Sequence, residues 1–159
     1  MMTPPAPAAT AAACLPPLVR WFEHLSPATL EALPTLYHPS VRFIDPFNDL
    51  HGTAAVQQLF AHMLDGLEQP RFVVLTQLAQ GDEAFLTWDF HFAWRGRPLR
   101  IHGASHMRFA PDGRVIWHRD YWDAAEQVLA HLPLLGRAVR WVQRRLRAPS
   151  APAQRRHQG

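Results

Sequence analysis

The chain has 159 residues, of which 48% are hydrophobic, and this length and composition suit one compact domain with a buried core. Cys14 is the only cysteine and lysine is absent, which excludes an internal disulfide, a cysteine-based metal site and a lysine Schiff base. The formal net charge is +3, and no stretch is long and apolar enough to cross a bilayer. We therefore expect a cytoplasmic protein.

Residues 1–16 are rich in alanine and proline and lack a positive segment followed by a long apolar run. This composition is typical of a disordered leader rather than a signal peptide. Residues 17–127 are expected to form the folded domain. Apolar spacing predicts one helix over 18–25 and a second over 26–37, with Ser26 as its N-cap ahead of Pro27.

A strand over 41–45 and a helix over 52–67 are predicted next. From residue 71 the hydrophobic period changes to two. Four strands are expected, separated by the turn signals GD, RGR and PDG, over 71–80, 83–94, 98–110 and 114–123. Helices followed by an antiparallel meander predict an α+β fold.

The turns also predict how the last three strands pair. They place Phe92 opposite Ile101, which puts Trp88 opposite Ser105, and they place Ser105 opposite Asp120. On this register, polar side chains share the apolar face of the sheet and would line a cavity: Ser105, His118 and Asp120.

The stretch FIDPFNDLHG (43–52) places Asp45 among apolar residues. An ionised carboxylate away from water is costly unless it is paired or neutralised, so two interpretations stay open. In one, Asp45 caps an Asp-Pro turn through neighbouring backbone N–H groups. In the other, Asp45 is a functional acid that faces a pocket.

Two segments carry a family resemblance. LYHPSVRFIDPFNDLHG (36–52) resembles the part of ketosteroid isomerases that holds their general base, and HMRFAPDGRVIWHRDYW (106–122) resembles their last hairpin. The likeness extends from Leu18 to Asp123 and points to the nuclear transport factor 2-like superfamily, which includes SnoaL-like cyclases, limonene epoxide hydrolases and scytalone dehydratases. The resemblance implies a cone-shaped fold with N-terminal helices packed on a curved antiparallel sheet.

The resemblance also implies site residues. The general base falls on Asp45, and the two oxyanion-hole donors fall on Trp21 and Ser105, which are weaker donors than the tyrosine and protonated aspartate of ketosteroid isomerases. A true steroid isomerase is therefore not expected. SnoaL-like cyclases place an acid–base residue on the last strand, where this chain has Asp120, with His118 nearby. Seven residues are expected to bind substrate: Trp21, Tyr37, Phe60, Trp88, Phe90, Ser105 and Trp122.

Together these residues predict a cofactor-independent enzyme that uses acid–base chemistry on a small hydrophobic molecule, with Asp45 as the base and His118 and Asp120 delivering or relaying protons. An isomerase, cyclase, dehydratase or hydrolase would each fit. The alternative for His118 and Asp120 is a solvated polar pair or a salt bridge to Arg119 or Arg108. The protein would then be a non-catalytic ligand-binding or assembly module.

Ten histidines raise the question of a metal site. His91, His102 and His106 fall on the outer face of the predicted sheet, where His91 and His102 would form a cross-strand pair. Zinc needs three converging ligands with supporting hydrogen bonds, so no metal is expected. We expect this face to form a homodimer interface instead, as is common in the family that the chain resembles.

The C-terminal part is basic, because residues 127–159 contain seven arginines and no acid. Apolar and arginine side chains alternate at helical spacing over 133–148, which predicts a basic amphipathic helix over 128–148 and a disordered tail over 149–159. The helix either packs on the domain with its arginines solvated, or contacts an anionic membrane surface and makes the protein membrane-peripheral. Without a base-reading motif, no nucleic acid partner is expected.

Overall fold

The structure is a computed structural model that describes residues 9–124. The compact unit that contains the sheet ends at Asp123, near the predicted domain end at residue 127. Its helices are α1 (Ala11–Glu23), the short α2 (Leu33–Leu36) and α3 (Thr53–Gly66), with a 3-10 turn, η1, over Leu30–Ala32. The predicted helix over 128–148 and the predicted tail over 149–159 lie outside the described residues.

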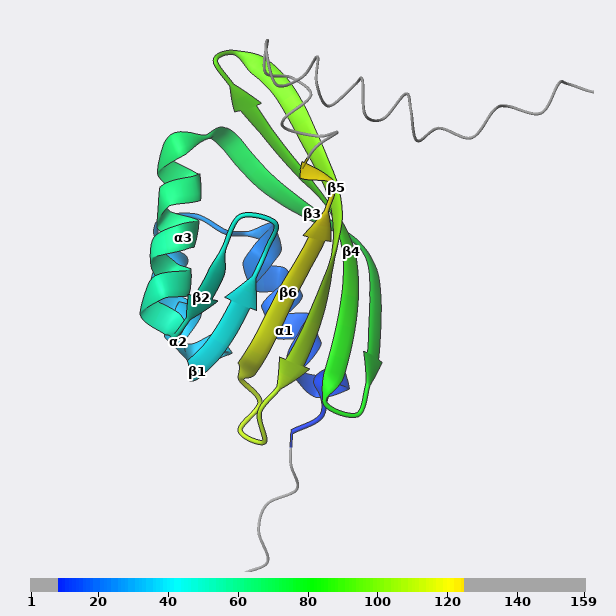
Figure 1. The fold of residues 1–159 in the computed structure, drawn as a ribbon. Helices are drawn as coiled ribbons and strands as arrows, with labels where there is room; N and C mark the ends of the chain where they lie inside the picture. The colour runs from blue at the N-terminus through cyan, green and yellow to red at the C-terminus, as the bar shows by residue number, and fades with distance from the viewer. Residues whose placement is uncertain (1–8, 125–159) are drawn as a thin grey trace, which may run out of the picture. The chain divides into compact units, whose positions relative to one another are not determined.

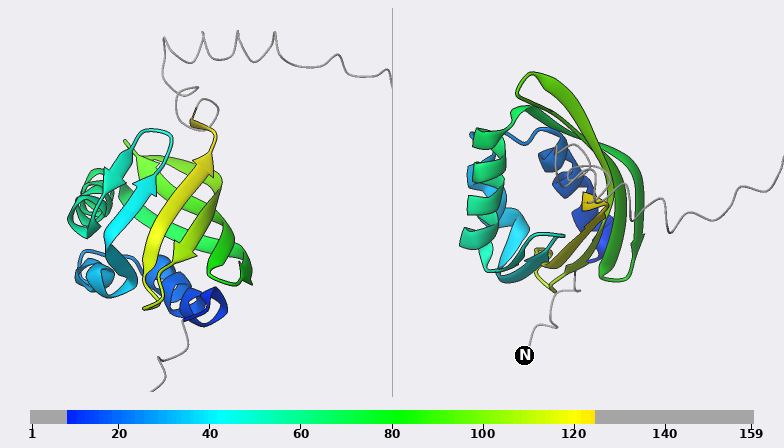
Figure 2. Two further views of the ribbon diagram at one scale, coloured as in Figure 1. Left: turned by 60° about the horizontal axis from the view of Figure 1, so that its bottom comes forward. Right: turned by 45° about the horizontal axis from the view of Figure 1, so that its top comes forward.

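Six strands form one sheet in the order β2-β1-β6-β5-β4-β3. The strands β3 (Glu68–Gln80), β4 (Glu83–Trp94), β5 (Arg97–Phe109) and β6 (Val115–Trp122) form the predicted antiparallel meander. The strand β1 (Tyr37–Ile44) pairs antiparallel with β2 (Asp49–His51) and parallel with β6. The sheet is curved and unclosed, and α1 and α3 lie on its concave side (Figures 1 and 2). The predicted α+β class is confirmed, with a mixed rather than a purely antiparallel sheet.

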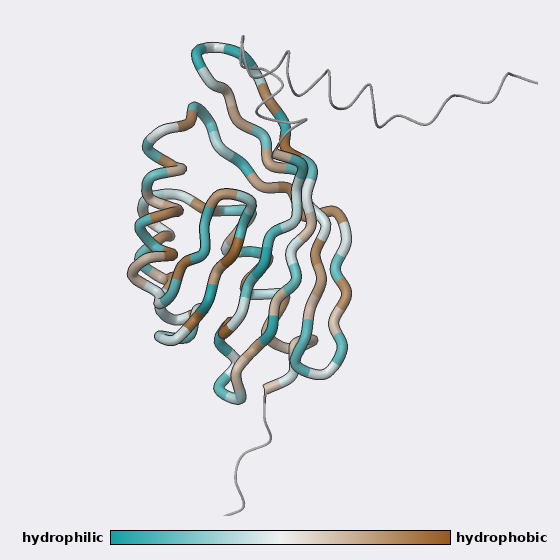
Figure 3. Tube along the Cα trace, viewed as in Figure 1, coloured by the Kyte–Doolittle hydropathy of each residue, from teal (hydrophilic) through white to brown (hydrophobic). Residues whose placement is uncertain are grey.

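Strand alternation decides which side chains enter the core. Along β4, Leu86, Trp88 and Phe90 are buried, whereas Phe85 points outward and is 47% exposed. Apolar and polar residues accordingly alternate along the strands (Figure 3). The β4–β5 turn is tight because Arg95 and Gly96 both adopt positive φ, 51° and 73°, which matches the twist of a two-residue hairpin.

The first helix begins earlier than predicted. Residues 11–16, which we expected in the disordered leader, belong to α1. The reason is tertiary: the Ala11 N–H donates to the Gly81 carbonyl (2.9 Å), and Ala11 and Leu15 are buried. Pro16 and Pro17 lie inside the helix.

Two further predictions need correction. Residues 26–37 do not form one helix, because hydrogen bonds between Ser26 and Thr29 close a local turn before η1 and α2. The β4–β5 register is shifted by two residues, so that Trp88 lies opposite Gly103 and His102 lies opposite Asp89 instead of His91. A shift of two preserves the inward and outward faces, so only the predicted neighbours change.

Candidate functional site

A chain of polar side chains crosses the concave face of the sheet. The Tyr37 hydroxyl lies 2.8 Å from Nδ1 of His118, and Nε2 of His118 lies 2.7 Å from Oδ1 of Asp120. The Ser105 hydroxyl donates to the same Asp120 oxygen (2.5 Å), and the Trp88 indole N–H donates to the Ser105 oxygen (2.8 Å). We call these five residues the polar network. Its β5–β6 part matches the predicted pairing of Ser105 with Asp120.

The chemistry of these groups limits the direction of the hydrogen bonds. An ionised carboxylate only accepts, so with Asp120 ionised Nε2 of His118 donates to it, and Nδ1 of a neutral imidazole then accepts from the Tyr37 hydroxyl. Burial, together with the nearby Asp120 carboxylate, raises the pKa of the Tyr37 phenol well above its usual range, which keeps its proton in place. Both nitrogens of His118 are thereby occupied within the protein. His118 is only 1% exposed, and the small cavity is the one described pocket that it lines.

A small cavity of about 20 Å³ adjoins the polar network. Ser105, His118 and Asp120 line it together with apolar side chains that include Phe60, Phe72 and Trp88. A cavity of this size holds about one water molecule. The network therefore reaches a small, nearly filled pocket whose wall is largely apolar.

Asp120 lies at the boundary between this cavity and the exterior. Its side chain is 16% exposed, and it also lines a depression of about 250 Å³ between the end of β6 and the loop after β1. Oδ1 accepts both network hydrogen bonds, while Oδ2 has no donor among residues 9–124. Asp120 is thus the one member of the polar network that lines both spaces.

Asp45 is arranged differently. Its carboxylate accepts from the backbone N–H groups of Phe47 (2.7 Å) and Asn48 (2.8 Å) and from the Asn48 side-chain amide (2.9 and 3.0 Å). These bonds close the turn between β1 and β2, as the turn interpretation predicted. Asp45 lines the depression beside Asp120 but not the cavity.

The other predicted residues lie in different parts of the structure. Phe60, Trp88 and Ser105 line the cavity, and the buried Tyr37 supports it from behind through His118. The Trp21 indole N–H donates to the Thr29 carbonyl (2.8 Å), so in this structure it is used within the protein. Trp122 lies outside the cavity, in the depression, where its ring contacts that of Phe47 (5.3 Å between centroids).

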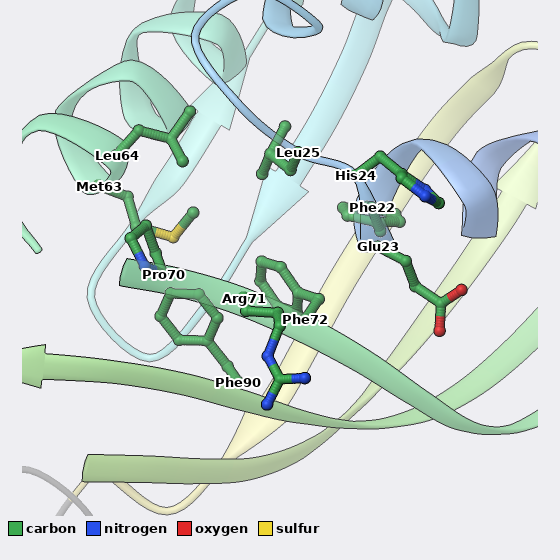
Figure 4. A pocket seen from close by; sticks show the side chains of 10 residues that line it. All are labelled: Phe22, Glu23, His24, Leu25, Met63, Leu64, Pro70, Arg71, Phe72 and Phe90. Atoms are coloured by element: carbon green, nitrogen blue, oxygen red, sulfur yellow. The ribbon is translucent and has the colours of Figure 1, made fainter. Parts of the chain in front are cut away.

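A second pocket of about 200 Å³ opens between the ends of α1 and α3 and the start of β3 (Figure 4). We call it the chamber. Phe90, a predicted substrate-binding residue, lines it. Phe22 and Phe72 line both the chamber and the cavity, with ring centroids 5.8 Å apart. Neither residue was among the predicted site residues, although the alternation of RFVVL could have placed Phe72 on the inner face of its strand.

The convex face of the sheet carries the predicted histidines. His102 Nδ1 lies 2.7 Å from Asp89 Oδ1, and Arg100 lies 3.4 Å from the same carboxylate. His106 stacks on Phe85 (4.2 Å between centroids). Residues 9–124 contain no cluster of three or more histidine, cysteine or acidic side chains that could hold a metal. Within the same range no helix has the length and hydropathy needed to span a membrane.

Comparison with known proteins agrees with this architecture. The model of the SnoaL-like domain family matches residues 18–118. The chain belongs to this family. The matched region contains Tyr37, Trp88, Ser105 and His118, and it ends just before Asp120. No curated protein matches the sequence.

Solved structures share the nuclear transport factor 2-like fold of this SnoaL-like protein. A protein of unknown function from Burkholderia pseudomallei K96243 has 18% identity and a TM-score of 0.65, covering 76% of this chain and 95% of its own. A hypothetical protein with a ketosteroid isomerase-like fold from Catenulispora acidiphila DSM 44928, in complex with trimethylamine, has 17% identity and a TM-score of 0.62, covering 71% of this chain and 88% of its own. An LEH-like epoxide hydrolase from M. tuberculosis has 11% identity and a TM-score of 0.60, covering 72% and 83%. At these identities the likeness establishes the fold alone.

Proposed function

We propose that this SnoaL-like protein is a cofactor-independent acid–base enzyme in which Asp120, not Asp45, exchanges the proton with the substrate. The observation that carries the proposal is the position of Asp120: one oxygen accepts hydrogen bonds from Ser105 and His118, and the side chain borders both the cavity and the depression. A general base must combine a fixed orientation with access to the reacting atom.

His118 acts as a positioning residue in this proposal. Its Nε2–H orients the Asp120 carboxylate and offsets its negative charge, while Tyr37 fixes the histidine tautomer. A proton passed from Asp120 through His118 would stop at Tyr37, which is fully buried. The proton therefore travels between Asp120 and the substrate rather than along the network.

The substrate class follows from the residues around the carboxylate. The cavity wall is aromatic and aliphatic, which suits a small hydrophobic molecule. A carboxylate base removes a proton from carbon readily when an adjacent carbonyl stabilises the resulting negative charge. We therefore assign the substrate to small ketones or keto esters, with isomerisation, cyclisation or dehydration as the overall reaction.

Deuterium incorporation tests this proposal without knowledge of the product. A panel of cyclic ketones and β-keto esters is incubated with the full chain in deuterated buffer, and incorporation next to the carbonyl is followed by mass spectrometry. Asp120→Asn is expected to lower the rate by about 10²–10⁴-fold, because Asn retains an oxygen for Ser105 and His118 but cannot accept the proton. Asp45→Asn is the matched control and is expected to leave the rate unchanged.

The reverse pattern, in which Asp45→Asn lowers the exchange rate and Asp120→Asn does not, would assign the role of the base to Asp45.

A second candidate is the non-catalytic binding or assembly module, which is favoured by the cavity volume of only about 20 Å³. In that case no ketone exchanges faster with the protein than in buffer alone. Binding of a ligand without exchange would assign the network a purely structural role.

The homodimer and the anionic membrane contact stay predictions. Exposed apolar side chains on the convex face, among them Leu78 (64%) and Phe85 (47%), support a dimer through this face. Light scattering of wild type and Phe85→Glu tests it, because a charge at the interface would yield monomers. Vesicle sedimentation with and without residues 133–159 tests the membrane contact, which is expected to weaken as salt rises.

A further inference from the structure

We infer that the chamber binds a small hydrophobic carboxylate, with Arg71 holding the anionic group at the rim and the apolar body lying against Phe72 and Phe90. The further step, that this chamber delivers to Asp120 a ketone substrate that also carries a carboxylate, rests on the proposed function. The binding itself does not.

The body of the chamber is apolar. Phe72 and Phe90 stack with ring centroids 4.4 Å apart, and Leu25, Met63 and Leu64 line the same pocket. Figure 4 shows the α3 side chains on one side of the chamber and the end of α1 on the other. Its volume of about 200 Å³ lies below the range of about 300–1,000 Å³ that is usual for drug-sized ligands, so we expect a one- or two-ring molecule.

Arg71 and Glu23 give the chamber one residue of each charge sign. Arg71 is exposed, and its guanidinium has no ion pair or hydrogen bond among residues 9–124, although it lines the chamber. Glu23, the acid at the same rim, already accepts a hydrogen bond from the Val74 N–H (3.1 Å). Arg71 is therefore available to a ligand, and a guanidinium binds a carboxylate through paired hydrogen bonds.

The wall between the chamber and the cavity consists of side chains. Phe22 and Phe72 line both spaces, and Phe72 is only half-buried. Rotation of the Phe72 side chain would join the chamber to the cavity beside Ser105 and Asp120 without backbone movement. A carboxylate held at Arg71 would keep its charge away from Asp120 while its carbon skeleton extends inward.

Two probes of the same shape test the inference: 2-naphthoate and the neutral 2-naphthalenemethanol. Dissociation constants are measured by calorimetry for wild type, Arg71→Gln, Arg71→Lys and the control Arg108→Gln, which lies outside the chamber. Arg71→Gln is expected to weaken the binding of naphthoate about five- to tenfold and to leave the binding of the alcohol unchanged. Arg71→Lys should restore part of the loss, and Arg108→Gln should have no effect.

Methyl-labelled methionine locates the probe by NMR. Met63 lines the chamber and Met107 is fully buried opposite His118, so binding in the chamber should shift the Met63 methyl signal and leave Met107 in place. The inference is overturned by an unmoved Met63 signal, by equal losses for acid and alcohol, or by no binding of naphthoate at millimolar concentration. Asp120→Asn should bind naphthoate as tightly as wild type. If the deuterium-exchange assay shows no activity, naphthoate binding in the chamber can therefore still be tested independently.

Discussion

Two histidine–aspartate pairs lie on opposite faces of the sheet with the same N–O distance, 2.7 Å. The His118–Asp120 pair is on the concave face, where the His118 side chain is 1% exposed, and the His102–Asp89 pair is on the convex face, where the His102 side chain is 59% exposed. Water competes for the hydrogen bond of the His102–Asp89 pair and screens its charges. Water cannot replace a lost partner of the buried His118–Asp120 pair. The two pairs therefore have the same N–O distance but are expected to contribute unequally to the free energy of unfolding.

The largest expected difference comes from removing each histidine. His118→Ala leaves the Tyr37 hydroxyl and the Asp120 carboxylate without their partner inside the core, and we expect a loss of about 3–5 kcal/mol in the free energy of unfolding. The matched variant His102→Ala should lose less than about 1 kcal/mol. Urea denaturation measures both. Similar losses would mean that burial does not separate the two pairs.

A smaller loss in the free energy of unfolding is expected from Gly103→Ala, because the added methyl group crowds the side chains on the concave face. A Cβ atom there would lie 2.5 Å from Cη2 and 2.7 Å from Cζ2 of Trp88, the indole that donates to Ser105. Moving the ring should cost about 1–3 kcal/mol. Gly66→Ala is the control, because nothing lies within 4 Å of the added carbon. Thermal unfolding of both variants decides whether this face is closely packed.

Tyr37→Phe tests the support behind His118. Loss of the hydroxyl leaves Nδ1 of His118 without its buried donor, which should cost about 1–2 kcal/mol. Tyr121→Phe removes a hydroxyl from a tyrosine that is 48% exposed and should change the unfolding free energy by less than about 0.5 kcal/mol. If Tyr37→Phe is equally neutral under urea denaturation, the hydrogen bond to His118 contributes nothing measurable.

The smallest effect is a pH dependence of the outer pair. The hydrogen bond from His102 holds the pKa of the Asp89 carboxyl below its ordinary value of 3.8, with burial opposing the shift. A depressed carboxyl pKa stabilises the folded state above pH 3.8 and loses that contribution as the pH falls through the folded-state pKa.

The gap in unfolding free energy between wild type and Asp89→Asn should therefore narrow from about pH 6 to about pH 3. Urea denaturation at both pH values measures this gap. A gap for Asp89→Asn that widens towards acid would contradict the sign of the shift.

Much of this architecture was predictable from the sequence. The two-residue period of 83–94 and 98–110 predicted the strands and their faces, because alternation is a property of the extended backbone itself. The same alternation is sufficient to assign Ser105, His118 and Asp120 to one face of the sheet. The four-strand meander followed from turns such as RGR, whose residues adopt positive φ at Arg95 and Gly96.

Other features were decided by contacts between distant residues. Tyr37 reaches His118 across 81 positions because β1 pairs in parallel with β6, and no local pattern encodes that pairing. The start of α1 depends on the hydrogen bond from the Ala11 N–H to the Gly81 carbonyl. This contact overrides the leader-like composition of residues 1–16. The Trp21 indole N–H likewise has a partner, the Thr29 carbonyl, that no local pattern in the sequence indicates.

By itself, the sequence determined the class of fold, the faces of the strands and the identity of the polar residues, because these depend on period, turn chemistry and side-chain type. Only the tertiary structure decided that Asp45 closes a turn while Asp120 borders the cavity and the depression. A carboxylate's role depends on which donors reach it and how much water it meets. Both are set by chain segments that are far apart in the sequence.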